Sequence, residues 1–90
     1  MSKCIHFIAH GRVQGVSYRA FTRQVARRHG LSGWVRNCSD GTVDGACEGP
    51  DAKVDAFLGE LGHGPLFAKV TRLEVRAGEP LDMTVFEVRR

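Results

Sequence analysis

The amino-acid sequence predicts an α+β fold in which two helices cover one face of a mixed, largely antiparallel sheet. Three observations lead to this prediction: the length of 90 residues, the alternation of strand-like and helix-like segments, and an Asp-Gly pair between two strand-like segments. A chain of this length has room for one core, and we expect a single domain over residues 1–90. The expected order is β-α-β-β-α-β with a short additional C-terminal strand, which is typical of the ferredoxin-like sandwich.

The first strand is expected over residues 3–10, "KCIHFIAH", and ends at Gly11. Alternate residues on one of its faces are apolar, as in a strand with one buried face: Ile5, Phe7 and Ala9. A helix is expected from Ser17, a candidate N-cap, to His29, after which Gly30 offers a C-cap. The apolar residues of this segment recur at helical spacing: Tyr18, Phe21, Val25 and Ala26.

The middle of the chain predicts a hairpin, because Asp40-Gly41 stands between strand-like residues 31–38 and 42–49. The third strand alternates, with Val43, Gly45 and Cys47 expected inward and Thr42, Asp44 and Glu48 outward. A second helix is expected from Pro50 to Leu61, since proline suits a first helical turn. Its apolar stripe has i, i+3, i+4, i+7 spacing: Val54, Phe57, Leu58 and Leu61. Residues 68–77 and 83–90 predict the last two strands.

The composition is that of a folded protein, with 42% hydrophobic and 26% charged residues. No apolar run approaches the ~18 residues of a membrane span, and the N-terminus does not resemble a secretory signal. We therefore expect a cytoplasmic protein that does not associate with membranes. The three cysteines lack C-x-x-C spacing, which favours reduced, buried thiols over disulfides or a zinc site.

Charge is distributed unevenly along the chain. The net charge is +3, yet residues 1–39 contain no Asp or Glu, and all ten acidic residues follow. A basic half favours an anionic partner, such as nucleic acid, a membrane surface or a small phosphorylated ligand. We interpret the arginines at 23, 27 and 28 as the solvated face of the first helix.

The segment "GRVQGVSYR", residues 11–19, joins the first strand to the first helix. Gly11 and Gly15 permit a main chain whose N–H groups converge on one point. The helix adds its free N–H groups and the positive end of its dipole, and Arg19 brings a bidentate guanidinium. These features favour a phosphate site, although the loop alone is equally compatible with a tight turn bearing surface arginines.

The segment "GWVRNCSDGTV", residues 33–43, contains a second candidate residue, Asn37, at the end of the second strand. An asparagine there is commonly a turn or capping residue. In a split βαβ fold, however, this strand end lies at a corner of the sheet next to the exit of the first strand. We therefore expect the Asn37 amide to lie near Arg19, where it would orient a water molecule toward a bound phosphorus atom.

Together, "GRVQGVSYR" and "GWVRNCSDGTV" resemble the two signature motifs of the acylphosphatase family, at the family's own separation. The resemblance covers essentially the whole chain. It implies hydrolysis of small acyl phosphates to a carboxylate and inorganic phosphate, with Arg19 binding the phosphate and Asn37 orienting the water. It further implies a main-chain phosphate cradle at Gln14, Gly15, Val16, Ser17, Tyr18 and Arg19. Inorganic phosphate or sulfate would be the product or a product-like ligand.

Neither motif holds a histidine, a carboxylate pair or a cysteine paired with a base. The reaction must therefore proceed without a general acid or a nucleophilic side chain from these motifs. A carboxylate is a good leaving group, with a conjugate-acid pKa of about 4, so no general acid is required. We expect no metal and no cofactor: His6 and His10 lack the spacing of a metal motif, and Cys38 is expected on the face opposite Asn37.

Two other interpretations remain at the level of sequence. A non-catalytic ferredoxin-like module could bind anions or RNA, but the strand aromatics of an RNA-binding sheet are absent, and we expect no specific nucleic acid. The second is an inactive interaction domain that kept the fold, but the presence of both Arg19 and Asn37 argues against it. Trp34 is expected either beside the site or packed under the hairpin. Nothing in the sequence demands more than a monomer.

Overall fold

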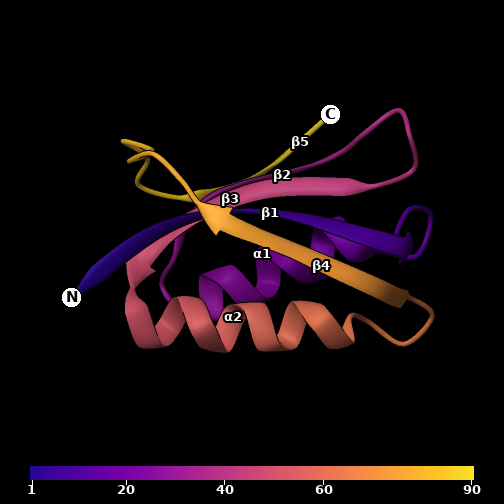
Figure 1. Cartoon of the computed structure of the whole chain (residues 1–90), viewed down its shortest axis with the longest axis horizontal. Helices are drawn as coiled ribbons and strands as arrows, with labels where there is room; N and C mark the ends of the chain where they lie inside the picture. The colour runs from indigo at the N-terminus through magenta and orange to yellow at the C-terminus, as the bar shows by residue number, and fades with distance from the viewer.

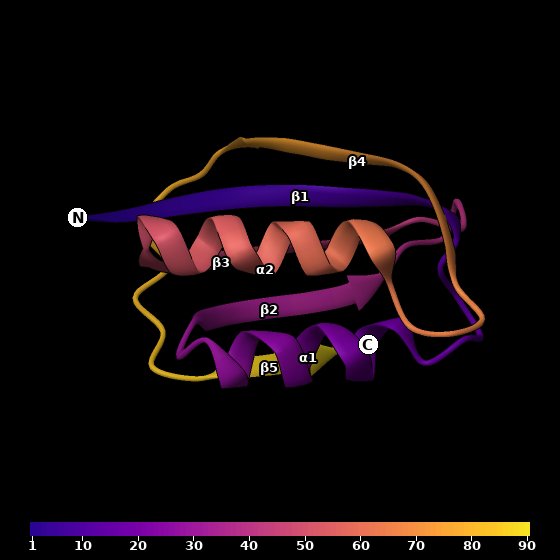
Figure 2. The same cartoon turned by 90° about the horizontal axis from the view of Figure 1, so that it is seen from below.

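The computed structural model describes residues 1–90 as one five-stranded sheet with both helices against the same face (Figures 1 and 2). The elements are β1 (Ser2–Arg12), α1 (Tyr18–Arg28), β2 (Ser32–Asn37), β3 (Val43–Pro50), α2 (Asp51–His63), β4 (Lys69–Ala77) and β5 (Phe86–Arg89). The strand order is β4-β1-β3-β2-β5, antiparallel except for the parallel pair of β2 and β5. This confirms the ferredoxin-like α+β fold. Neither helix is both long and apolar enough to cross a membrane.

The core lies between the sheet and the helices and is built from the periodic apolar positions. Ile5, Phe7 and Ala9 of β1 are buried on the helix side, as their alternation predicts. The stripe of α2 supplies Val54, Phe57 and Leu61, while Leu58 is only partly buried. Of the predicted stripe of α1, Phe21 is likewise only partly buried, and Thr22 is buried in addition. The buried hydroxyl of Thr22 donates a hydrogen bond to the main-chain carbonyl of Tyr18.

The end of β1 differs from the expected one. β1 continues past Gly11 to Arg12, with a change of register against β4 between His10 and Gly11. The extra residue of this bulge is Thr71 of β4, which has no partner on β1. Gly11 adopts φ 115°, and a Cβ there would overlap the carbonyl of Lys69, so only glycine fits. β1 therefore continues through Gly11 to Arg12 before the loop that leads into α1.

The hairpin between β2 and β3 is centred on Asp40 and Gly41, as predicted. Asp40 Oδ1 accepts hydrogen bonds from both the main-chain N–H and the hydroxyl of Thr42, and Gly41 has φ 92°. The alternation of β3 is only partly as expected, because Asp44 points away from the helices yet is just 7% exposed. Its neighbours on the outer face, Arg36 and His6, cover it through polar contacts.

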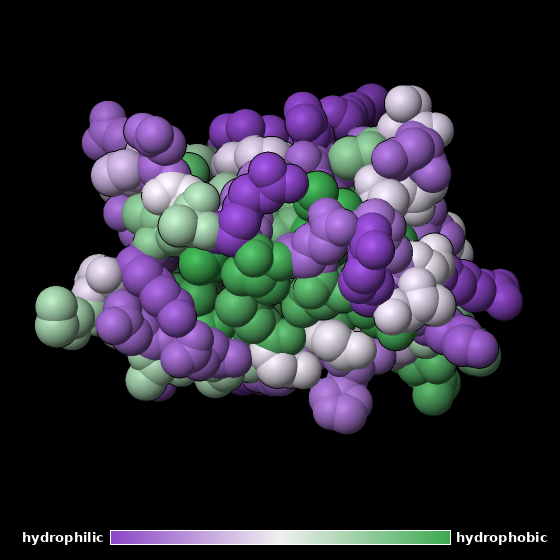
Figure 3. Space-filling model, in the orientation of Figure 1, coloured by the Kyte–Doolittle hydropathy of each residue, from purple (hydrophilic) through white to green (hydrophobic).

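The edge strand β4 is less well covered than the central strands. Val75 pairs with Phe7 and so faces the helix side, but it is exposed because no further strand lies beyond β4. Figure 3 shows an apolar surface at the centre of this side of the molecule, in the region between β4 and α2.

Candidate active site

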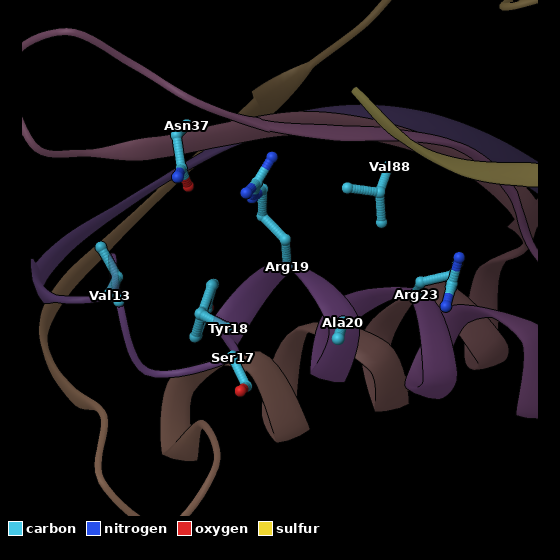
Figure 4. A pocket seen from close by; sticks show the side chains of 9 residues that line it. Val13, Ser17, Tyr18, Arg19, Ala20, Arg23, Asn37 and Val88 are labelled. Atoms are coloured by element: carbon cyan, nitrogen blue, oxygen red, sulfur yellow. The ribbon is translucent and has the colours of Figure 1, made fainter. Parts of the chain in front are cut away.

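A cleft of about 430 Å³ opens between the start of α1 and the sheet (Figure 4). Its lining comes from the loop before α1, from α1 itself and from the ends of two strands: Val13, Gly15, Ser17, Tyr18, Arg19, Ala20, Arg23, Asn37 and Val88. The volume is in the range of small-molecule sites. No lining residue is acidic and two are arginines, so the cleft suits an anion.

The loop that enters α1 is curled by two residues with positive φ. Gly15 has φ 74° and Ser17 has φ 64°. Left-handed residues in such a loop form concavities lined by main-chain N–H groups. Ser17 stands at the N-cap position, but its side chain makes no capping hydrogen bond. The first N–H groups of α1 are therefore open to a ligand at the positive end of the helix dipole.

Gln14 holds this loop against the β2–β3 hairpin. Its Nε2 donates hydrogen bonds of 2.8 Å to the carbonyl oxygens of Cys38 and Thr42. The side chain thus fixes the loop next to the strand end that carries Asn37. Gln14 and Val16, which belong to the predicted cradle, do not line the cleft. Val16 packs against the core.

Tyr18 anchors the start of α1. Its side chain is buried, and its hydroxyl donates a hydrogen bond of 2.9 Å to the carbonyl of Leu61 near the end of α2. Burial raises the pKa of the Tyr18 hydroxyl, which therefore stays protonated and remains a donor. The side chain thereby positions the N-terminus of α1, and Tyr18 also lines the cleft.

Arg19 is oriented by the last strand. Its Nη1 donates a hydrogen bond of 2.9 Å to the main-chain oxygen of Arg89. No carboxylate pairs with Arg19, so the rest of its guanidinium remains available to an anion in the cleft. No sequence pattern predicts this contact, because the acceptor is a main-chain oxygen at the far end of the chain. Val88, the neighbouring β5 residue, also lines the cleft. The sequence does not predict its place there, because that place depends on how β5 pairs with β2.

Asn37 lies across the cleft from Arg19, as the sequence predicts, and its amide points into the cleft (Figure 4). Asn37 Oδ1 is buried and has no hydrogen-bond partner within the protein. Leaving a buried acceptor unsatisfied costs about 1–3 kcal/mol. An acceptor held in this state next to an arginine and a helix N-terminus is arranged for a ligand or a water molecule.

The prediction that Arg23 belongs to a solvated face of the first helix is only partly right. The side chain is exposed, as expected, but it also lines the cleft, one helical turn after Arg19. The i, i+4 spacing of the two arginines was the signal that could have revealed it. Arg27 and Arg28 are exposed as expected, and neither lines this cleft.

The remaining candidates lie on the opposite face of the sheet. Cys38 Sγ donates to Asp44 Oδ1 at 3.3 Å, and His6 Nε2 lies 3.3 Å from Asp44 Oδ2. Trp34 also lies on this outer face, where the guanidinium carbons of Arg36 and Arg89 lie 5.2 and 5.1 Å from its ring centroid. No three His, Cys, Asp or Glu side chains are grouped as a metal site.

Known proteins resemble this chain over nearly its whole length. The sequence model of the Acylphosphatase family matches residues 5–88. A protein named acylphosphatase from Haloarcula marismortui is 48% identical over 84 residues, which cover 93% of this chain and 92% of that protein. Another of the same name, from Thermococcus kodakarensis, is 45% identical over 83 residues, with 92% and 91% covered.

Solved structures agree with the sequence comparison. The crystal structure of acylphosphatase from Bacillus subtilis superposes with a TM-score of 0.94 at 34% identity, over 100% of both chains. The structure of an acylphosphatase from Coxiella burnetii also superposes with a TM-score of 0.94, at 33% identity, over 98% of this chain and 93% of the other. Sequence and fold thus point the same way, and the protein belongs to the acylphosphatase family.

Proposed function

We propose that the cleft binds the phosphoryl group of a small acyl phosphate and that Arg19 and Asn37 carry its hydrolysis. Cleavage of the carboxyl-phosphate bond is the activity of the family to which the chain belongs. The observation that supports these roles best is the unpartnered, buried Asn37 Oδ1, which faces the same cleft as Arg19 and the N-terminus of α1.

In this proposal, the loop and Arg19 hold the phosphoryl group. The N–H groups at the start of α1 and the guanidinium of Arg19 neutralise the nonbridging oxygens, on which negative charge is concentrated. Phosphoryl transfer passes through a loose transition state, so positioning and charge stabilisation account for most of the catalysis. The bond from Arg19 to the Arg89 carbonyl keeps the guanidinium in place before the substrate arrives.

Asn37 positions the nucleophile. Its Oδ1 accepts a hydrogen bond from a water molecule, whose oxygen is thereby directed at phosphorus. The water oxygen forms the new bond to phosphorus. The bond from phosphorus to the carboxyl oxygen breaks, and its electron pair stays on the carboxyl oxygen. The carboxylate leaves unprotonated, and the proton of the water passes to an oxygen of the phosphate. Neither a metal nor a cofactor takes part in this proposed sequence.

The absence of a general acid in this scheme makes it selective. An alkoxide is a far poorer leaving group than a carboxylate and needs protonation to depart. The test is to compare benzoyl phosphate with an alkyl phosphate monoester at neutral pH. Rapid hydrolysis of benzoyl phosphate alone supports the proposal, whereas comparable turnover of the monoester contradicts it.

The rival interpretation, a non-catalytic anion- or RNA-binding module, is not favoured, because the family match covers almost the entire chain. We further propose that residues 1–90 act as one domain and as a monomer. Inorganic phosphate would be released as product, and sulfate would bind in its place. A cytoplasmic location would keep the three free cysteines reduced.

A further inference from the structure

The cleft is larger than a phosphoryl group requires. If each atom needs no more than the roughly 30 Å³ of a water molecule, the five heavy atoms of a phosphate fill about 150 Å³. The cleft measures about 430 Å³. The remaining space extends along α1 past Ala20 and Val88 toward Arg23 (Figure 4). This extension has an apolar wall and a cationic end.

Arg23 has no carboxylate partner. It takes part in none of the ion pairs or side-chain hydrogen bonds of the structure, and α1 contains no acidic residue. The acidic residue of β5, Glu87, pairs with Arg89 at 3.2 Å. Side chains alternate along a strand, so Glu87 faces away from Val88 and from the cleft. The charge of Arg23 is therefore free to act on a ligand.

We propose that Arg23 makes the enzyme prefer acyl phosphates whose acyl group carries a second anionic group at its far end. The inference rests on the proposed function, because it takes the phosphoryl group to lie against the loop and Arg19. The acyl chain would then run across Val88, and its terminal carboxylate or phosphate would meet the guanidinium of Arg23.

The spacing of the two arginines sets the length of the acyl group. Residues four apart on a helix are separated by about 6 Å along its axis. In a four-carbon dicarboxylic acyl phosphate, five bonds separate phosphorus from the distal carboxyl carbon. Bonds of roughly 1.5 Å advance about 1.25 Å each along a zigzag chain, so the five bonds also span about 6 Å. A shorter acyl group, such as acetyl, would leave Arg23 without a contact.

The test compares succinyl phosphate with butyryl phosphate, which has the same chain but ends in a methyl group. The kcat/KM of each is measured at low ionic strength for the wild-type chain and for Arg23→Gln, Arg23→Lys and Arg27→Gln. Arg27 is the matched control, an exposed arginine one turn further along α1 that does not line the cleft.

An exposed ion pair is worth up to about fivefold in binding. We expect the wild type to prefer succinyl phosphate by about three- to fivefold, mainly through a lower KM. Arg23→Gln should abolish this preference, Arg23→Lys should retain most of it, and Arg27→Gln should leave it unchanged. Added KCl should reduce it, because salt screens exposed charges.

Two results would overturn the inference alone: hydrolysis of both substrates by the wild type without preference, or a preference that survives in Arg23→Gln. Equal loss in Arg27→Gln would also overturn it, because the effect would then reflect the overall charge of α1. If the wild type hydrolysed neither substrate, the proposed function itself would fail.

Discussion

Arg19 Nη1 donates a hydrogen bond of 2.9 Å to the main-chain oxygen of Arg89, so the first helix and the last strand meet at the candidate active site. β5 pairs in parallel with β2, the strand that ends at Asn37. The C-terminal strand thus positions the arginine at the edge of the sheet that also presents the asparagine. This relationship explains why a strand of four residues matters to a site built mainly from the N-terminal half.

Removing Arg89 and Arg90 should lower kcat/KM for benzoyl phosphate by at least about tenfold, because Arg19 loses the acceptor of a charge-assisted hydrogen bond worth about 1.5–3 kcal/mol. Arg89→Ala keeps the main-chain oxygen and should stay within about twofold of the wild type. Circular dichroism of both variants checks that the fold is retained. Equal activity of the two variants would show that the carbonyl does not position Arg19.

Asn37→Ala should leave the free energy of unfolding unchanged or raise it by up to about 1 kcal/mol. The substitution removes a buried acceptor that has no partner, and with it a desolvation cost. Urea unfolding measures the difference. A loss of 2 kcal/mol or more would, on this scale, mean that the amide makes a stabilising interaction within the folded protein.

Asp44→Asn should destabilise the protein by about 1.5–3 kcal/mol at pH 7, the worth of a hydrogen bond to a charged group. Burial alone would raise the pKa of Asp44, but hydrogen bonds from Arg36 and Cys38 outweigh it and hold the pKa below its ordinary value. A lowered folded-state pKa stabilises the protein above the unfolded-state pKa of about 3.9 and ceases to do so as the pH falls through the folded-state pKa.

The difference in unfolding free energy between the wild type and Asp44→Asn should therefore be complete near pH 7 and shrink below about pH 4. Asp55→Asn serves as the control, since Asp55 pairs with Lys3 on the surface and should change stability little. A difference for Asp44→Asn that did not vary with pH would exclude its charge as the cause.

Cys38→Ser should keep kcat for benzoyl phosphate within about twofold of the wild type. The thiol donates to Asp44 on the outer face of the sheet, opposite the Asn37 amide, and a serine hydroxyl can replace it there. Mass spectrometry during turnover checks for a phosphorylated protein. Near-complete loss of activity, or a phosphocysteine adduct, would replace the positioned water with a covalent mechanism.

The fold could be predicted because its apolar residues follow the periods of strands and helices. Ile5, Phe7 and Ala9 repeat every second residue, and Val54, Phe57 and Leu61 follow the helical repeat. The burial of Asp44 could not be predicted from this periodicity. Alternation identifies the face of a sheet on which a side chain lies, whereas burial there depends on Arg36 and His6 from neighbouring strands.

The residues of the site likewise include some that the sequence predicts and others that it does not. Arg19 and Asn37 belong to local motifs whose place at the end of a strand or the start of a helix is readable from the sequence. The carbonyl of Arg89 and the wall formed by Val88 depend on how β5 pairs with β2, which no local pattern specifies. Gln14 was predictable only in part. The sequence predicts the loop that carries it, but not the hydrogen bonds that its side chain donates to the carbonyls of Cys38 and Thr42.

The most direct test of the roles proposed for Arg19 and Asn37 is the hydrolysis of benzoyl phosphate in excess EDTA by the wild type, Arg19→Ala and Asn37→Ala. We expect full activity of the wild type without metal and a loss of at least about 100-fold in each folded variant, the effect of removing a group that stabilises or positions the transition state. Activity that needed added Mg²⁺, or either variant turning over at the wild-type rate, would contradict the account.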